Sequence, residues 1–228
     1  MKRFLMVMAV SLIVLAFAGT GLAADVLDIT IPLPLTGSKA KFGEIEKRSY
    51  EIAAEEINAA GGIKGKKVVL HFEDSQGKPE ISRAIAEKII DVKKQPFVMG
   101  EYSSSCSKAI AAVAEERKVP YLVVTGASDT ITQQNYKYVF RMNPSVSYYT
   151  GGLRSFLKKV VKPRTVAILY ESTDFGTKGA EGMVKDAKKL GMKVVMKEKY
   201  ESGAVDFKPI LSKLKSKRPD VIYMVSYV

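Results

Sequence analysis

The chain has 228 residues, a formal net charge of +12 and 46% hydrophobic residues. So large an apolar share excludes an intrinsically disordered chain, and the length allows more than one packed unit. The lysines are scattered over the expected helices rather than stacked with aromatic side chains in one stripe, which argues against nucleic acid as a partner.

The N-terminal segment has the order of a secretory signal peptide. Lys2 and Arg3 precede an apolar run over 4–18, and small residues follow up to Ala23. A membrane anchor is the alternative, but the run is shorter than the ~20 apolar residues that a spanning helix needs. We therefore expect 1–23 to be a signal peptide, removed after Ala23 or the alanine that follows, and the mature protein to be periplasmic.

Cys106 is the only cysteine of the chain. An exported chain with one cysteine has no internal disulfide and depends on its packed core. No cysteine lies near the expected cleavage site, so we expect no lipid anchor there. The thiol lies at the start of a predicted helix, whose dipole would lower its pKa, but a small buried hydrophobe is the role we expect.

After this segment, strand and helix patterns alternate. We predict strands over 26–33, 67–73, 97–100, 120–124 and 138–141, and helices over 42–60, 80–93 and 104–117. The expected buried sides of these helices are Ile45, Ile52, Ala53, Ile57 and Ala60 in the first, Ile81, Ile85, Ile89 and Val92 in the second, and Cys106, Ala109, Ile110 and Val113 in the third. Short strand–helix–strand units of this kind imply a parallel sheet with helices on both faces.

Residues 143–145 (Asn-Pro-Ser) interrupt the alternation, and proline fixes its own backbone and biases its neighbour away from helix. We place the crossing between two lobes there, with a first α/β lobe over 24–143 and a second over 144–228. In the second lobe we predict helices over 146–161, 175–190 and 206–214, and strands over 165–170, 193–200 and 220–227.

The sequence stops on the last of these apolar strands, whereas chain ends are normally polar and exposed. We therefore expect the second lobe to be partial. The predicted fold class is α/β, with two doubly wound parallel-sheet lobes of which the second is incomplete.

Hydroxyl-rich turns follow two of the expected strands. The strands 97–100 and 121–124 lead into serines at 103–105 and into the segment 125–129. In open α/β sheets small molecules bind outside the carboxyl ends of strands, where N–H groups at the start of the next helix favour an anion. We expect Ser104, Ser105 and Ser128 to face a ligand; the alternative is that the serines at 103–105 only cap the helix that begins near Ser104.

Four aromatic residues lie just past a predicted strand end or on the first turn of a helix, on the side of the serines: Phe42, Tyr102, Phe175 and Tyr227. Aromatic walls with a few polar groups are typical of a small-molecule cleft. Each of these rings alone would more often be part of the core.

Nucleotide-binding and hydrolase motifs are absent from the sequence, and His71 is the only histidine. A serine hydrolase that uses Ser104 with His71 is an alternative, but a histidine inside a strand and without a nucleophile elbow is more often structural. One histidine and one cysteine do not make a metal site. We expect no enzyme, no catalytic residue, no metal and no cofactor.

Several segments together carry a family resemblance: 31–37 with Phe42 and Gly43, then 57–65, 100–105, 125–129 and 138–144. With them the chain resembles the periplasmic branched-chain amino-acid-binding proteins of ABC transporters, the leucine-binding type of periplasmic-binding-protein fold type I. The resemblance covers the whole mature chain but only part of a complete family member. It implies two lobes that close on an amino acid or similar carboxylate and deliver it to a membrane permease; a sensor that reports its ligand to a receptor or kinase is the alternative.

The resemblance also implies roles for single residues. Ser104 and Ser128 match the positions that hold the ligand carboxylate, the carbonyl of Gly126 matches the acceptor of its ammonium, and Phe175 and Tyr227 match aromatic contacts of the second lobe. The acidic partner of the ammonium is expected beyond the end of the chain, and serine stands at 128 where threonine is commoner. The choice of amino acid, amide or aromatic acid as ligand therefore stays open.

Overall fold

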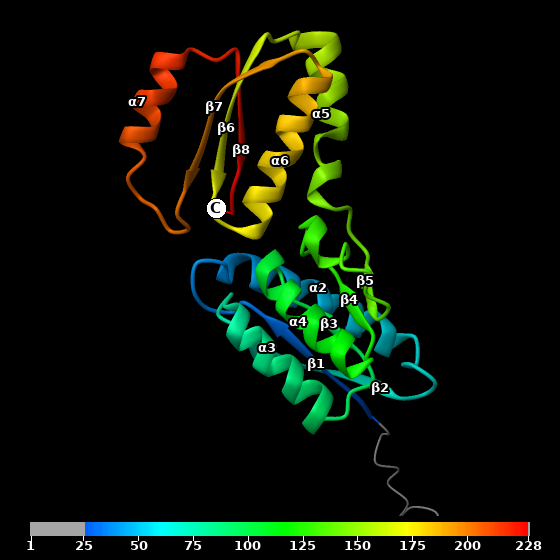
Figure 1. Cartoon of the computed structure of the whole chain (residues 1–228). Helices are drawn as coiled ribbons and strands as arrows, with labels where there is room; N and C mark the ends of the chain where they lie inside the picture. The colour runs from blue at the N-terminus through cyan, green and yellow to red at the C-terminus, as the bar shows by residue number, and fades with distance from the viewer. Residues whose placement is uncertain (1–25, 228) are drawn as a thin grey trace, which may run out of the picture.

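The computed structural model describes residues 26–227, and the expected signal peptide over 1–23 lies outside the described residues. Figure 1 shows two α/β lobes, with the C-terminal end of the second lobe facing the first. Within residues 26–227, no helix has both the length and the apolar content to cross a bilayer.

The first lobe alternates strands and helices as the sequence predicts. Its elements are β1 (Val26–Leu33), α2 (Ala40–Ala59), β2 (Lys67–Asp74), α3 (Pro79–Glu87) with a π-helical extension (Lys88–Val92), β3 (Val98–Gly100), α4 (Ser104–Arg117), β4 (Tyr121–Val123), a 3-10 turn (Asp129–Ile131) and β5 (Val139–Arg141). These strands pair in parallel, β1 with β2 and β3 with β4 and β5. The predicted α/β class with parallel sheets is confirmed.

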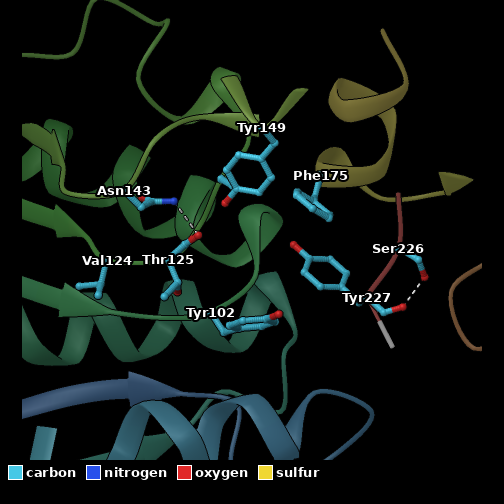
Figure 2. A pocket seen from close by; sticks show the side chains of 9 residues that line it. Tyr102, Val124, Thr125, Asn143, Tyr149, Phe175, Ser226 and Tyr227 are labelled. Carbon is cyan, nitrogen blue, oxygen red and sulfur yellow. Dashed lines mark hydrogen bonds between the residues drawn. The ribbon is translucent and has the colours of Figure 1, made fainter. Parts of the chain in front are cut away.

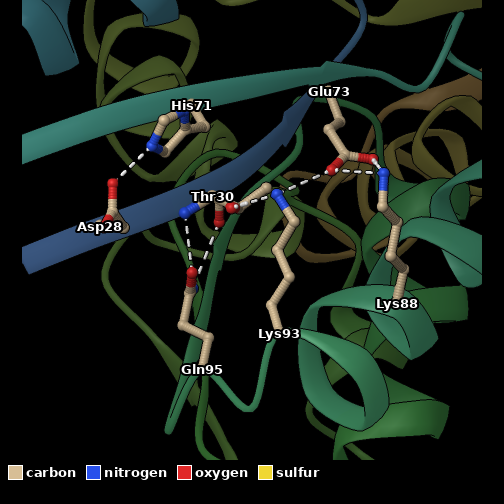
Figure 3. A network of polar contacts seen from close by, with 7 residues as sticks. All are labelled: Asp28, Thr30, His71, Glu73, Lys88, Lys93 and Gln95. Atoms are coloured by element: carbon tan, nitrogen blue, oxygen red, sulfur yellow. Dashed lines mark hydrogen bonds and ion pairs between the residues drawn. The ribbon is translucent and has the colours of Figure 1, made fainter.

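The sheet of the first lobe consists of two hydrogen-bonded pieces, β1-β2 and β3-β4-β5. Between them the Gln95 side chain replaces strand pairing: its Oε1 accepts from Thr30 N at 2.7 Å, and its Nε2 donates to Thr30 O at 3.2 Å and Phe97 O at 2.8 Å (Figure 3). Pro96 has no N–H to offer a neighbouring strand, so a side-chain amide satisfies these main-chain groups instead. One main-chain bond, from Glu101 N to Pro32 O at 2.9 Å, joins the pieces near the carboxyl end.

Helices cover both faces of this sheet. α3 and α4 pack on one core with β3 and β4, and α2 packs with β1 and β2 on another. The π-helical turn ends in Val92, which is 73% exposed although the sequence pattern predicts it to be buried. A π-helix has more residues per turn than an α-helix, so the α-helical spacing of buried residues in α3 ends at Glu87 and does not extend to Val92.

The predicted buried side of α2 is wrong. Ile45 and Ile52 are 55% and 57% exposed, whereas Gly43, Glu46 and Ala54 are buried. A Cβ at position 43 would lie 2.1 Å from the Pro34 main-chain oxygen. The helix thus approaches the sheet through its small residues, which turns the isoleucines outward.

The second lobe has a three-stranded parallel sheet in the order β7-β6-β8. Its elements are a 3-10 turn (Val146–Tyr148), α5 (Thr150–Phe156) with a π-helical extension (Leu157–Val161), β6 (Thr165–Glu171), α6 (Asp174–Lys189), β7 (Lys193–Tyr200), α7 (Lys208–Lys217) and β8 (Val221–Val225). α5 and α6 pack on one face of the sheet and α7 on the other (Figure 1). The single helix predicted over 146–161 is instead a 3-10 turn, a short α-helix and a π-helical extension. The helix predicted over 206–214 is α7, which begins and ends later than predicted.

The turn after β3 brings the serines to the cleft. Gly100 has φ +109°, and Glu101, which follows it, has φ +68°, in the left-handed region. A Cβ at position 100 would lie 2.6 Å from Ile31 Cγ2 and 2.9 Å from Pro32 O. Glycine is therefore required at 100 by both the backbone angle and the close approach of β1.

We expect Gly100→Ala to lower the free energy of unfolding by about 2 kcal/mol, through backbone strain and the clash with β1. Chemical denaturation followed by circular dichroism measures this loss. Gly191→Ala is the matched control: its φ is +70°, but nothing lies within 4 Å of the added Cβ, so it reports the strain alone. Equal losses in the two variants would contradict the role of the contact with β1.

Candidate functional site

A cavity of about 290 Å³ lies between the two lobes. It is lined by Tyr102, Val124, Thr125, Ala127, Asn143, Tyr149, Phe175, Ser226 and Tyr227 (Figure 2). The residues up to 143 come from the carboxyl ends of β3, β4 and β5, and the others from the second lobe, at or after the crossing between the lobes. This is the edge at which the sequence predicts a ligand.

Aromatic rings form a continuous wall across the cleft. Phe42 stacks on Tyr102 with ring centroids 4.5 Å apart and planes inclined by 4°. Tyr227 lies 5.6 Å from Tyr102 and 5.1 Å from Phe175, and Tyr149 lies 6.3 Å from Phe175. The structure thus brings the four aromatic residues of the sequence prediction together and adds Tyr149. Such rings offer flat apolar surface with hydroxyls at the edge.

The N-terminus of α4 faces this wall. The main-chain N–H of Ser104 donates to the hydroxyl of Tyr227 at 3.1 Å, so a group of the second lobe occupies the helix end. Ser103 is the N-cap residue, yet its side chain makes no capping bond, and its hydroxyl is buried without a partner among the described residues. Capping therefore does not explain the serines. The dipole of α4 favours an anion at this end.

Ser104 also joins the two hydroxyl-rich turns. Its Oγ accepts from the N–H of Ala127 at 3.1 Å and of Ser128 at 3.0 Å. The Ser128 hydroxyl in turn accepts from Thr130 N at 3.3 Å. Both serines are buried and neither lines the cavity, although Ser104 bonds to two lining residues, Ala127 and Tyr227. Ser105 is partly exposed on the first turn of α4.

Gly126 lies against α4, since a Cβ there would come within 2.4 Å of Ser107 Oγ. Its carbonyl oxygen accepts from Arg141 Nη1 at 2.6 Å, with Asn143 Nδ2 at 3.5 Å. Sequence reasoning missed Arg141 and Asn143. Both follow the same rule as the serines, because they stand at or just after the carboxyl end of a strand, β5.

Two carboxyl groups are buried close to Tyr102. Glu101 accepts from Ser82 Oγ at 3.0 Å and from the N–H of Tyr102 at 3.0 Å, and burial raises its pKa. Neither carboxyl oxygen of Glu46 has a hydrogen-bond partner among residues 26–227, and burial raises its pKa to about 7. Burial, with Glu46 nearby, also raises the pKa of Tyr102 to about 12, so its phenol is neutral.

The hydrolase pair does not form. His71 Nε2 lies 2.6 Å from Asp28 Oδ1 on the outer face of β1 and β2 (Figure 3). Ser104 has its own partners in the turn after β4, and no hydrogen bond joins it to His71 in the described structure. Cys106 is buried and its pKa is raised to about 11 by that burial, which fits the small hydrophobe that the sequence predicts. Within residues 26–227, no cluster of His, Cys, Asp or Glu could hold a metal ion.

The same local device lies in the first turn of α2 and of α6, the helices that follow β1 and β6, and sequence reasoning did not use it. Phe42 and Gly43 lie in the first turn of α2, and Phe175 and Gly176 lie in the first turn of α6. In each case a Cβ on the glycine would lie 2.1 Å from a main-chain oxygen, of Pro34 and of Glu171. Because neither backbone atom can move aside, glycine is needed and the preceding phenylalanine is held at the rim of the cleft.

Comparison with known proteins agrees with this arrangement. A family model described as "periplasmic binding protein" matches residues 27–228. The chain therefore belongs to the periplasmic binding protein family.

Among curated relatives, Leu/Ile/Val-binding protein homolog 8 of Brucella suis biovar 1 is 33% identical over 222 residues, which cover 93% of this chain and 55% of the relative. The leucine-binding protein LivK of Thermotoga maritima is a similar solved structure, with 28% identity, a TM-score of 0.80 and coverage of 87% of this chain and 56% of that one. The resemblance to the leucine-binding type is thus confirmed. The chain spans about half the length of these relatives.

The substrate-binding protein LivJ of Streptococcus pneumoniae, solved in complex with isoleucine, has a TM-score of 0.79 at 23% identity and covers 89% of this chain and 57% of that one. At that identity the likeness bears on the fold alone. It agrees with the type I fold of two parallel-sheet lobes, here with part of the second lobe.

Burial of Glu46 makes the stability of the folded protein decrease as the pH rises. Its pKa is raised from the ordinary 4.5 to about 7, so the unfolded chain ionises this group first as the pH rises. We expect its contribution to the free energy of unfolding to be intact below pH 4.5 and to be lost as the pH rises to about 7, by up to about 3 kcal/mol.

Glu46→Gln should therefore flatten the pH profile of stability over this range, as urea unfolding at a series of pH values will measure. Glu55→Gln, on the exposed side of the same helix, is the control. If the two variants show the same profile, Glu46 does not carry the effect.

Proposed function

We propose that this chain is an exported solute-binding protein that captures an amino acid or a similar small carboxylate between its two lobes and delivers it to the permease of an ABC transporter. Export rests on the signal peptide predicted over 1–23 and on the family, whose members are periplasmic binding proteins. The proposed boundary between the lobes is at 143/144. Transport of a branched-chain amino acid is supported by the names of the relatives, Leu/Ile/Val-binding and leucine-binding proteins.

The observation that carries the proposal is the meeting of the α4 N-terminus with the aromatic wall at a cavity between the lobes. The N–H of Ser104 and the helix dipole suit a carboxylate, and the rings of Tyr102, Phe175 and Tyr227 suit an apolar side chain. In the structure the Tyr227 hydroxyl accepts the bond that a ligand carboxylate would accept. Ligand entry would exchange these partners, so Tyr227 would move from the helix end toward the ligand.

Both lobes contribute to the lining, so a ligand gains its full set of contacts only when the lobes are closed. The Thr130 hydroxyl of the first lobe already donates to Asp174 Oδ2 of the second at 2.7 Å. A ligand shifts the open–closed equilibrium by its difference in affinity for the two states. The permease would then distinguish loaded from empty protein by the closed shape.

A thermal-shift screen of the purified protein against branched-chain, polar and aromatic amino acids and small carboxylic acids tests the proposal. A ligand at a hundredfold excess over its Kd stabilises the fold by about 2.7 kcal/mol, which is a clear rise in Tm. Calorimetry then gives the affinity. If no compound of these classes binds saturably, the proposed function is wrong.

We expect Ser104→Ala and Ser128→Ala each to weaken binding by about 1.5–3 kcal/mol, the range for hydrogen bonds to a charged group. Lys185→Ala, on the exposed face of α6, is the control and should leave binding unchanged. Calorimetric titration measures all three, and denaturation checks that each variant is folded. Binding as tight as that of the parent in both serine variants would place the carboxylate elsewhere.

A further inference from the structure

Tyr227, which follows β8 and lines the cavity, receives three contacts from the first lobe. Its hydroxyl accepts from Ser104 N at 3.1 Å, and its ring centroid lies 5.6 Å from that of Tyr102. In addition, the ammonium of Lys39 lies over the Tyr227 ring, 5.2 Å from its centroid. The proposed function uses the first two contacts and gives no role to Lys39.

The Tyr227 ring is the partner that the structure offers to the charge of Lys39. This lysine directly precedes α2 and is partly buried. Within residues 26–227 its ammonium forms no ion pair and donates no hydrogen bond. A lysine ammonium is attracted to the face of an aromatic ring by the ring quadrupole, and more strongly where water is displaced. The charge of Lys39 therefore favours the present place of the ring.

The stem of Lys39 lies along the turn after β2. Gly77 is part of that turn and has φ +64°. A Cβ at position 77 would lie 3.4 Å from Lys39 Cδ and 3.8 Å from its Nζ, which is ordinary contact. The apolar stem thus packs on the first lobe while the charged end reaches the second. A lysine packed in this way loses less conformational entropy on meeting the ring than a freely mobile one.

Two other lysine–ring contacts lie within single lobes. Lys47 Nζ lies 5.9 Å from the ring centroid of Phe72 in the first lobe, and Lys197 Nζ lies 5.4 Å from that of Tyr170 in the second. Among the described residues, the contact of Lys39 alone crosses from one lobe to the other. Separation of the lobes breaks this contact and leaves the other two intact.

We propose that Lys39 is a positioning residue for Tyr227: its ammonium holds the ring between the lobes and stabilises the closed arrangement in which the cleft is assembled. Lys39 acts through the ring and need not touch the ligand. This inference rests on the proposed capture of a small carboxylate between closing lobes, and it assigns a residue that slows the release of that ligand.

Lys39→Met removes the charge and keeps an apolar side chain of similar length. With leucine and 4-methylpentanoate as probes, we expect Lys39→Met to weaken binding by about threefold to tenfold. The loss should lie in faster dissociation, because the contact forms only after the lobes have closed. Calorimetry gives the affinity, and stopped-flow tyrosine fluorescence gives the two rates in this tryptophan-free chain. Lys39→Arg should restore slow dissociation, since a guanidinium also stacks on aromatic faces.

A double-mutant cycle tests the contact without a ligand. Urea unfolding is compared for the parent, Lys39→Met, Tyr227→Leu and the double variant. Because leucine has no aromatic face, Lys39→Met should lower the urea midpoint in the parent and cause no further loss beside Tyr227→Leu. Additive losses in the cycle would show that the two side chains do not interact.

Two controls separate this role from others that a lysine could have. Lys197→Met removes a matched contact within the second lobe and should leave the dissociation rate unchanged. Lys41→Met removes an exposed charge from the start of α2 and reports long-range attraction of an anion. If Lys39→Met changes the association rate as Lys41→Met does, and leaves dissociation unaltered, Lys39 acts through long-range charge and the inference is wrong.

The outcomes separate the two proposals. Unchanged dissociation in Lys39→Met, or no rescue by Lys39→Arg, overturns the role of Lys39 and leaves the proposed function standing. If the parent binds neither probe nor any other small carboxylate, the proposed function fails and the role of Lys39 in ligand release fails with it.

Discussion

The hydroxyl of Ser104 accepts from two successive main-chain N–H groups of the turn after β4, and the first-lobe edge of the cleft depends on this pairing. It fixes the start of α4 against the end of the neighbouring strand. The left-handed turn at Gly100 and Glu101 makes the approach possible, and the same Ser104 bonds to Tyr227 through its main chain. One residue thus ties together two strand ends and the opposite lobe.

Close to this edge the protein buries two acidic groups, Glu46 and Glu101. Burial raises the pKa of both carboxyls. A neutral carboxyl does not repel a ligand carboxylate, whereas an ionised one would.

The strands, the helix order and the meeting of four aromatic residues could be predicted, because buried apolar runs and strand ends obey local rules. The segments 104–117 and 193–200 match α4 and β7 to the residue. The buried side of α2 could not be predicted from hydrophobicity, since close packing at Gly43 outweighs the preference of Ile45 for burial. The place of Arg141 at a strand end could be predicted, but its bonds to the carbonyls of Gly126 and Ser128 could not, because no side-chain pattern reveals contacts with main-chain oxygens.

The burial of Cys106 within α4 has a practical consequence. Its raised pKa keeps the thiol protonated and its position keeps reagents away, so the native cysteine does not compete for thiol-directed dyes. A cysteine introduced on either lip of the cleft would be the single reactive thiol of the folded molecule. An environment-sensitive fluorophore attached there would turn lobe closure into an optical signal without any prior removal of native cysteines.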